Sequence, residues 1–352
     1  MGIIGAGLAF ERLHYPAYLE LKDRYQVVAV CDREEKKARF WVEKLGLGEE
    51  AAYTDYREML QRPDLDAVDI MVPIPANFTV VEDVIGAWAG RSGKAVLCEK
   101  PLAPDYEQAE AFLALAERSG IPIMVAENYR FEEEIDGLRR LVVEEKVGRT
   151  VYFLQNRVAC FPCAMTKDDF ARTEWRQHPA YPGGTLLDVG VHDLAALRYI
   201  FGPIERLHAF GRRQGDDFSP YAAVSVNLRF RSGVIGQFSF YDAGREPHRP
   251  LVGLRIFGTA GEIYLEERDA GIIHVDHNDD RHEEIRYTPR RGYYHELVEF
   301  HRALMEKRPF TVTPATAFGD VKAVFAILRS IERGEAVPVE EAKSPAKVGA
   351  GS

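Results

Sequence analysis

The sequence lacks the features that would place it in a membrane or on a nucleic acid. No stretch approaches the ~18 apolar residues that a membrane-spanning helix needs, and no signal-peptide pattern precedes the first glycines. The formal net charge is −10, so there is no basic excess to neutralise phosphates. The acidic residues are scattered and form no tail. We therefore expect a cytoplasmic protein with no membrane and no nucleic acid as its partner.

Cysteine is also scarce, with four residues in the whole chain. Cys31 and Cys98 fall in predicted buried strands, which is not the pattern of a disulfide framework. Cys160 and Cys163 form a C-x-x-C pair, but neither a second pair nor an adjacent histidine completes a zinc site. The sequence thus predicts two free thiols in a loop at this position, and no metal centre.

The chain is long enough for two domains. Its 352 residues are more than a domain with one hydrophobic core usually contains. Its 46% of hydrophobic and 28% of charged residues are typical of a soluble globular protein. We expect a first domain over residues 1–122, a second over 123–341 and a flexible tail over 342–352.

Short apolar runs alternate with amphipathic segments in the first part. We predict strands at 3–4, 27–31, 67–72, 94–98 and 121–126, and helices at 8–22, 34–45, 56–61, 80–88 and 105–118. Asp105 and Gln108 resemble a capping box, and Gly120 is a helix stop signal. Continuous apolar strands between helices predict an α/β domain with a parallel sheet covered on both faces. Only four residues precede Gly5, so either the given sequence begins late or this first strand is unusually short.

The second part contains consecutive strands separated by close turn signals. The predicted strands are 151–159, 207–212, 222–231, 234–241, 251–257, 262–265 and 272–275. Strands without intervening helices predict a large, mostly antiparallel sheet. We expect helices 185–201 and 294–306 to flank it, and a last helix over 315–333.

Gly5-Ala6-Gly7 follows an apolar run and precedes a predicted helix, the context that a dinucleotide fingerprint requires. Small residues let the backbone approach a pyrophosphate at the helix N-terminus. Phe10 occupies the place of the third glycine, so a simple tight turn is the alternative.

Asp32 ends the second strand, 22 residues beyond Phe10, where an acidic side chain can accept hydrogen bonds from the adenosine ribose. The alternative is a helix N-cap. Asp32 should repel a 2′-phosphate and favour NAD, although Arg33 could receive that phosphate, so NADP stays possible.

Lys100 leaves the predicted strand 94–98 at its carboxyl end, where open parallel sheets place their ligands. Pro101 restricts Lys100 to an extended backbone, and Glu99 adds a second polar group. On its spacing alone, Lys100 would be a solvated loop residue.

Asp188 and His192 are four residues apart in a predicted helix, which places them on one face in contact. A carboxylate beside a histidine fixes its tautomer and raises its basicity, and histidine commonly takes an alcohol proton. A buried structural pair is an equal alternative. Gly190 between them indicates close packing.

With these motifs the chain resembles the glucose–fructose oxidoreductase / inositol dehydrogenase / rhizopine-catabolism (Gfo/Idh/MocA) family. The matching segments are Gly5–Gly7, Asp32, Asp69–Pro73, Glu99–Pro101, Asn128–Phe131, Trp175–Arg176 and Gly183–Asp193. The resemblance implies a Rossmann domain followed by an α/β domain with a large open sheet. It also implies NAD(P)-dependent chemistry on sugars or polyols, in homodimers or homotetramers built on that sheet.

The resemblance also implies roles for individual residues. Lys100 would stabilise the reacting oxygen and His192 would be the general acid/base, with Asp188 orienting it or binding substrate. The implied cofactor contacts are Gly5, Gly7, Leu8, Ala9, Asp32, Arg33, Pro73, Ile74, Asn77, Glu99, Lys100 and Asn128. The implied substrate contacts are Lys100, Tyr129, Arg172, Trp175, Arg176, Asp188 and His192.

Three alternatives stay open: an NAD-dependent glycosidase that oxidises its sugar transiently, a dinucleotide-binding regulator, and a metal site at Asp188, His192 and Asp193. One helix offers few ligands for the metal. Loops over 161–181 and 242–249 should choose the substrate, which the sequence does not name. Residues His274–His277 look like a solvated hairpin, to which we assign no role.

Overall fold

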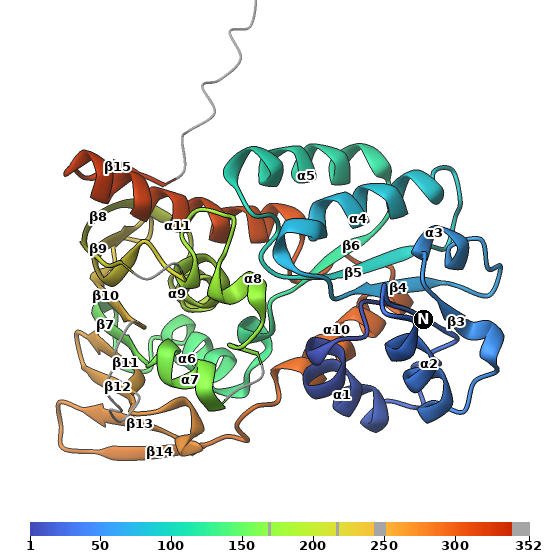
Figure 1. Cartoon of the computed structure of the whole chain (residues 1–352). Coiled ribbons are helices and arrows are strands. Elements are labelled where there is room, and N and C mark those ends of the chain that lie inside the picture. Colours follow the sequence, from blue (N-terminus) through green and yellow to red (C-terminus); the bar gives the residue numbers. More distant parts are fainter. Residues whose placement is uncertain (168–169, 216–217, 243–250, 340–352) are drawn as a thin grey trace, which may run out of the picture.

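The computed structural model describes residues 1–167, 170–215, 218–242 and 251–339. The predicted tail over 342–352 lies outside these residues. Two sheets, each with its own helices, make up the described chain (Figure 1). Within the described ranges, every helix is too short or too polar to cross a membrane.

The first sheet has six parallel strands in the order β3-β2-β1-β4-β5-β6. Its strands are β1 (Gly2–Ile4), β2 (Ala29–Cys31), β3 (Ala52–Tyr53), β4 (Ala67–Ile70), β5 (Ala95–Glu99) and β6 (Ile123–Ala126). The short strand β1 lies inside the sheet and pairs with both β2 and β4. This confirms the predicted parallel sheet. Residues 123–126 belong to this sheet because they form its last strand, β6, which pairs with β5.

Helices cover both faces of this sheet, as Figure 1 shows. They are α1 (Tyr15–Glu20), α2 (Glu35–Lys44), α3 (Tyr56–Met59), α4 (Ile74–Ala87) and α5 (Tyr106–Ser119). Asp105 caps α5 by accepting a hydrogen bond from the Gln108 N–H, and Gly120 ends it with φ at 67°. A π-helical turn, η1 (Phe10–His14), precedes α1.

The second sheet has nine strands in the order β14-β13-β12-β11-β7-β10-β9-β8-β15. The pairs are antiparallel except that β10 runs parallel to β7. The strands are β7 (Thr150–Val158), β8 (Ile204–Arg213), β9 (Tyr221–Phe230), β10 (Ile235–Tyr241), β11 (Leu251–Gly258), β12 (Gly261–Leu265), β13 (Ile272–His277), β14 (His282–Arg286) and β15 (Val337–Pro338). The predicted antiparallel sheet is confirmed.

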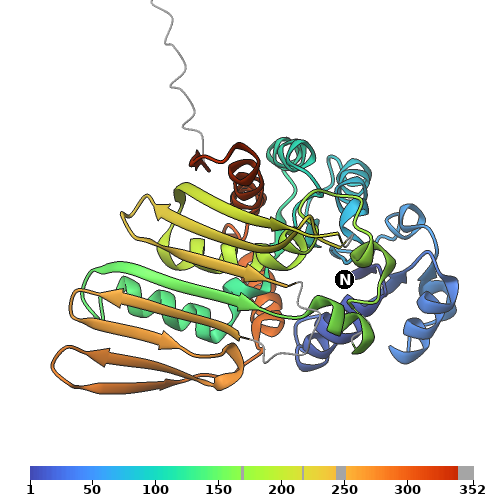
Figure 2. The same ribbon diagram turned by 60° about the vertical axis from the view of Figure 1, so that its left-hand side comes forward.

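Helices cover one face of the second sheet (Figure 2). They are α6 (Glu133–Val143), α9 (Val191–Phe201) and α11 (Pro314–Arg333). Burial alternates along β9, where Val226 and Leu228 are buried while Asn227 and Arg229 are exposed. The opposite face of the sheet is therefore left to solvent or to another chain.

Helix α10 (Gly292–Glu306) does not flank the second sheet, and that expectation was wrong. Leu297, Phe300 and Ala303 join the apolar cluster beneath the first sheet together with residues of α1 and α2. An amphipathic pattern shows that a helix has an apolar face, but not which sheet that face covers.

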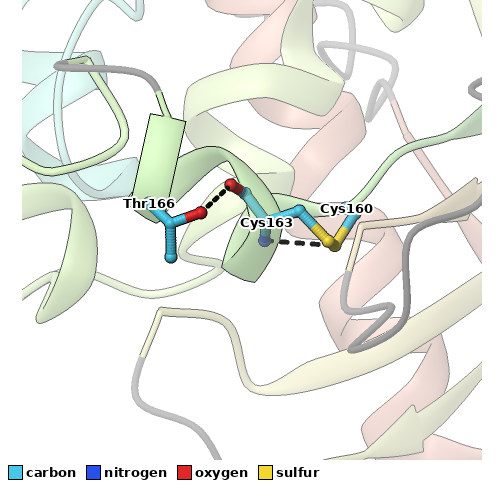
Figure 3. The surroundings of a disulfide bond; sticks show 3 residues. All are labelled: Cys160, Cys163 and Thr166. Carbon is cyan, nitrogen blue, oxygen red and sulfur yellow. Dashed lines mark hydrogen bonds between the residues drawn. A yellow bond between two sulfur atoms is a disulfide. The ribbon is translucent and has the colours of Figure 1, made fainter.

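Cys160 and Cys163 form a disulfide bond (Figure 3), so the prediction of two free thiols was wrong. Helix α7 (Phe161–Lys167) begins between them, and its first turn brings the two Cα atoms to 5.2 Å. That separation lies within the usual range for a disulfide. Cys31 and Cys98 are free and buried, as expected for the strands that contain them.

Candidate active site

The glycine loop joins β1 to η1 and leaves room beside its backbone. Gly5 has φ at 93°, and a Cβ atom there would lie 2.4 Å from the carbonyl oxygen of Met71. Only glycine fits such a position. A Cβ on Gly7 would meet nothing within 4 Å among the described residues. The loop can therefore accept a phosphate group close to its backbone.

Phe10 does not obstruct this loop, although it stands where the third glycine was expected. Its side chain is fully buried and its ring meets that of Trp41 edge-on, with centroids 4.7 Å apart. The Trp41 indole N–H donates a hydrogen bond to the Ala6 carbonyl, 3.1 Å away. Leu8 and Ala9, at the start of this helical segment, are only half-buried.

Asp32 lies beside the same loop. Its carboxylate accepts hydrogen bonds from the Ala6 N–H and from the Glu34 N–H, each at 2.9 Å. Each carboxylate oxygen keeps a further lone pair, so ribose hydroxyls can still bind. The local capping role and the cofactor role of Asp32 are thus compatible. Arg33 is exposed next to it. These residues fit a dinucleotide.

Lys100 follows β5 and points to the segment before α9. Its ammonium donates to the backbone carbonyl of Asp188 at 2.6 Å and to Asp188 Oδ1 at 3.1 Å. Arg176, in α8 (Glu174–Gln177), donates from Nε to Asp188 Oδ2 at 2.7 Å. Lys100 has three protons and uses two of them here. One ammonium proton thus remains for a ligand oxygen.

Asp188 is an ionised clamp between two cations. Burial alone would raise its pKa, but the charges of Lys100 and Arg176 and their hydrogen bonds hold the pKa of Asp188 far below its usual range. The guanidinium of Arg176 lies 4.0 Å from the ring centroid of Trp175. Asp188 therefore fixes the positions of Lys100 and Arg176 together.

His192 is held by a different carboxylate from the one we expected. Its Nδ1 lies 2.6 Å from Oε1 of Glu127, and its ring stacks on Tyr129 with centroids 4.4 Å apart. Both oxygens of Asp188 are taken by Lys100 and Arg176. The expected pairing of Asp188 with His192 was wrong. Residues Leu186–Gly190 form a π-helical turn, η4, so ordinary α-helical spacing does not hold there.

Glu127 was not predicted, and it completes the site. It directly follows β6, as Lys100 follows the neighbouring strand β5. Burial raises its pKa, but the charges of His192 and Lys100 and the hydrogen bond from His192 bring the pKa of Glu127 below its usual value. An ionised Glu127 makes Nδ1 of His192 the protonated nitrogen. Nε2 of His192 has no hydrogen-bond partner in the described part of the chain.

Asn77 and Glu99 support the turn that carries Lys100. Helix α4 begins at Ile74, directly after Pro73. Asn77 in this helix donates hydrogen bonds to the carbonyls of Glu99 at 2.8 Å and Pro101 at 3.2 Å. Glu99 accepts a hydrogen bond from the Lys100 N–H at 3.1 Å.

His14 links this turn to the glycine loop, and sequence reasoning missed it. It is fully buried and contacts Asp69 at 2.8 Å and Glu99 at 3.0 Å. Burial opposes the charge of His14, but Asp69 and Glu99 raise its pKa well above the usual value. A charged His14 therefore holds the Glu99 carboxylate in place.

The remaining predicted residues lie in different surroundings. Asn128 is buried and donates to Glu132 Oε1 at 3.1 Å, whereas Arg172 is exposed. Asp193 is buried and accepts hydrogen bonds from Gln155, at 3.1 Å, and from Arg157. Arg157 also donates to the Tyr129 hydroxyl at 2.6 Å. Asp193 thus anchors α9 to the second sheet.

Two family models match this chain. Residues 1–127 match the model described as "Oxidoreductase family, NAD-binding Rossmann fold", and residues 136–264 match the GFO/IDH/MocA C-terminal domain. The chain belongs to the Gfo/Idh/MocA oxidoreductase family. The first domain is accordingly an NAD-binding Rossmann domain, and the chain is an NAD(P)-dependent oxidoreductase. The predicted fold, enzyme class and cofactor are confirmed.

Named relatives of this oxidoreductase include two sugar or polyol dehydrogenases. It is 28% identical over 265 residues to D-apiose dehydrogenase of Paraburkholderia graminis, covering 75% of this chain and 66% of that protein. It is 25% identical over 355 residues to myo-inositol 2-dehydrogenase of Thermotoga maritima, covering 97% and 98%. The crystal structure of an oxidoreductase from Thermotoga maritima matches with a TM-score of 0.84 and 27% identity, over 96% and 97% of the two chains.

Asp242 is a further acidic group near the oxidoreductase site. It follows β10 and is the part of the predicted 242–249 loop that lies among the described residues. Burial, together with the charges of Asp188 and Asp193, raises its pKa to about 7 despite the opposing charge of Arg157. Asp242 is thus a carboxyl group that holds its proton in the folded state at mildly acidic pH.

We expect Asp242→Asn to stabilise the fold at alkaline pH. The pKa of Asp242 is higher in the folded protein than in the unfolded chain, so Asp242 does not destabilise wild type below its unfolded pKa. As pH rises, ionisation of the buried carboxyl lowers the free energy of unfolding. This loss is complete above pH 7 and amounts to about 1.4 kcal/mol for each unit by which the folded and unfolded pKa values differ. Thermal unfolding of both proteins from pH 4 to pH 9 measures this effect. Asp23→Asn, at an exposed site, is the control. A difference that does not change with pH would contradict the expectation.

Proposed function

We propose that this oxidoreductase transfers hydride between its nicotinamide cofactor and a secondary alcohol or ketone of a sugar, polyol or sugar derivative. The observation that carries the proposal is the pairing of a lysine ammonium and a histidine imidazole with two ionised carboxylates. Lys100 with Asp188, and His192 with Glu127, meet near the carboxyl ends of the adjacent strands β5 and β6. Ligands bind outside this edge in open α/β sheets.

Each group then has a defined task. The free ammonium proton of Lys100 binds the substrate oxygen and stabilises the negative charge that develops on it. Nε2 of His192 takes the hydroxyl proton during oxidation and returns it during reduction. The charge of Glu127 stabilises the imidazolium that results. The nicotinamide supplies the acceptor or donor of the hydride.

The cofactor is held by the first domain in this proposal. The glycine loop from Gly5 to Ala9 binds the pyrophosphate, and Asp32 binds the adenosine ribose and favours NAD over NADP. Pro73, Ile74, Asn77, Glu99 and Asn128 complete the surroundings. Asn77 and Glu99 act by positioning the Lys100 turn, to which both are hydrogen-bonded.

The substrate class is proposed from the site and from the named relatives. The proposed substrate contacts combine hydrogen-bond donors with aromatic faces, which suits a ligand that carries several hydroxyl groups. They include Tyr129, Arg172, Trp175 and Arg176. The relatives named for D-apiose and myo-inositol are consistent with such a ligand.

We further propose that the chain forms a homodimer or homotetramer through the open face of the nine-stranded sheet. Phe210, Ile235 and Tyr241 expose 65%, 48% and 37% of their surface on that face. Light scattering measures the molar mass directly. The cytoplasmic location stays a prediction.

Initial rates with a panel of sugars, polyols and sugar acids test the function. Each substrate is combined with NAD and with NADP, and the absorbance of the reduced nicotinamide is followed. We expect net cofactor reduction with at least one class, and faster rates with NAD. Glycoside cleavage without net reduced cofactor would favour the glycosidase instead. Cofactor binding without turnover across the panel would favour a regulatory protein.

A further inference from the structure

The hairpin of β13 and β14 carries ligand-type side chains on one face. It forms an outer edge of the nine-stranded sheet (Figure 1). His274 pairs with Glu284 and Asp276 pairs with His282 across the two strands. Cross-strand partners and alternate residues of a strand face the same side. Two imidazoles and two carboxylates therefore share one surface.

Three of these side chains lie near the separation that one shared ion requires. One ligand atom from each of His274, His282 and Glu284 lies within 4.8 Å of the others. The two imidazole rings are stacked at 5.5 Å, and Nε2 of His282 lies 3.9 Å from a Glu284 oxygen. Ligands at about 2.0–2.2 Å from a metal ion lie roughly 3–3.5 Å apart. The side chains of His282 and Glu284 are 49% and 44% exposed, so small rotations can close the gap.

Asp276 prepares His282 for this role. Its Oδ1 lies 2.6 Å from Nδ1 of His282, which holds a proton on Nδ1 and turns Nε2 toward Glu284. A metal-bound histidine usually donates its other N–H to a carboxylate in this way. The hydrogen bond to Asp276 is an observation independent of the clustering of the three ligands.

The chemistry of the donors selects the kind of ion. Imidazole nitrogens suit zinc, nickel, copper and cobalt, whereas magnesium and calcium prefer oxygen ligands alone. Glu262 pairs with Asp276 on the neighbouring strand β12 and adds negative charge to the same face. Three protein ligands leave the remaining positions of the ion to water or to another molecule.

We propose that this face of the hairpin binds a divalent transition-metal ion through His274, His282 and Glu284, with Asp276 positioning His282. The site belongs to different elements from Lys100 and His192, and an ion there joins strand β13 to the edge strand β14. Turnover of the oxidoreductase does not depend on it.

Titration of the chelator-treated full chain with Co²⁺ and Zn²⁺ tests the proposal. We expect one visible Co²⁺ absorption band that saturates at one ion per chain and is displaced by Zn²⁺, and a rise in melting temperature with Zn²⁺. His274→Gln combined with His282→Gln abolishes both effects. Asp276→Asn weakens binding by about 10- to 100-fold.

His208→Gln is the matched control, since it removes a histidine from β8 of the same sheet. It should bind metal like wild type. Circular dichroism without metal shows that every variant is folded. Wild type without saturable binding, or a double histidine variant that binds as tightly as wild type, would overturn the proposal.

Discussion

Lys100→Met should lower kcat by about 10²- to 10³-fold while leaving NAD affinity nearly unchanged. The ammonium is the group that faces the developing negative charge on the substrate oxygen, and removal of one such donor has an effect of this size. Methionine keeps the length and the apolar stem of lysine. Asp188 retains its ion pair with Arg176 in the variant, so its carboxylate is not left unpartnered. Steady-state kinetics and fluorescence titration with NADH measure the two quantities.

Lys94→Met is the matched control for this experiment. Lys94 lies just before the other end of β5 and donates to the Leu65 carbonyl. We expect its variant to keep wild-type kcat, with at most a loss of thermal stability. A Lys100→Met protein that turns over at the wild-type rate would remove Lys100 from the mechanism. Equal losses in both variants would point to a general effect on the domain.

The sequence predicted the parts of the site that depend on one element at a time. Lys100 was placed at the ligand-binding edge because it follows a buried parallel strand, whereas its role was implied only by the family resemblance. Asp105 and Gly120 correctly predicted the two ends of their helix because capping is decided by a few neighbouring residues. The same holds for Asp32, whose position follows from one strand and one loop.

Partnerships across the fold were not predictable in this way. His192 is paired with Glu127, which is 65 residues away in sequence. His14 is paired with Asp69 and Glu99, which are 55 and 85 residues away. Helix spacing suggested Asp188 for His192 because it considers only local neighbours, and the π-helical turn further altered that spacing.

Of the elements that the sequence analysis missed, α6 and β14 were missed for different reasons. Our prediction contained no helix over α6, although Ile135, Leu138 and Leu141 recur at helical spacing and are buried. This spacing in the sequence would have been enough to predict the helix. Strand β14 has Ile285 between charged residues, a composition typical of an edge strand that must avoid pairing with other chains. Its pattern is weak because only one neighbour, β13, defines it.

His192→Ala should lower kcat by about 10²- to 10⁴-fold, with NAD affinity unchanged. Nε2 of His192 is the proposed proton acceptor, and general acid/base groups contribute effects of this size. The missing ring leaves a space above Tyr129, on which it stacks at 4.4 Å. Added imidazole should therefore restore part of the activity. The rate of alcohol oxidation is measured with and without imidazole over a range of pH.

Glu127→Gln provides a graded version of the same loss. Glutamine can still accept a hydrogen bond from Nδ1–H of His192, but it carries no charge to stabilise the imidazolium. Charge-assisted hydrogen bonds are roughly twice as strong as neutral ones, so the variant should retain more activity than His192→Ala.

His208→Ala is the control for both variants: it changes a histidine in β8 of the nine-stranded sheet and should behave as wild type. If Glu127→Gln were as active as wild type while His192→Ala was inactive, the charge of Glu127 would have no part in proton transfer. If His192→Ala kept full activity, another base would have to be sought, and Asp242 is the nearby group whose pKa of about 7 would suit that role.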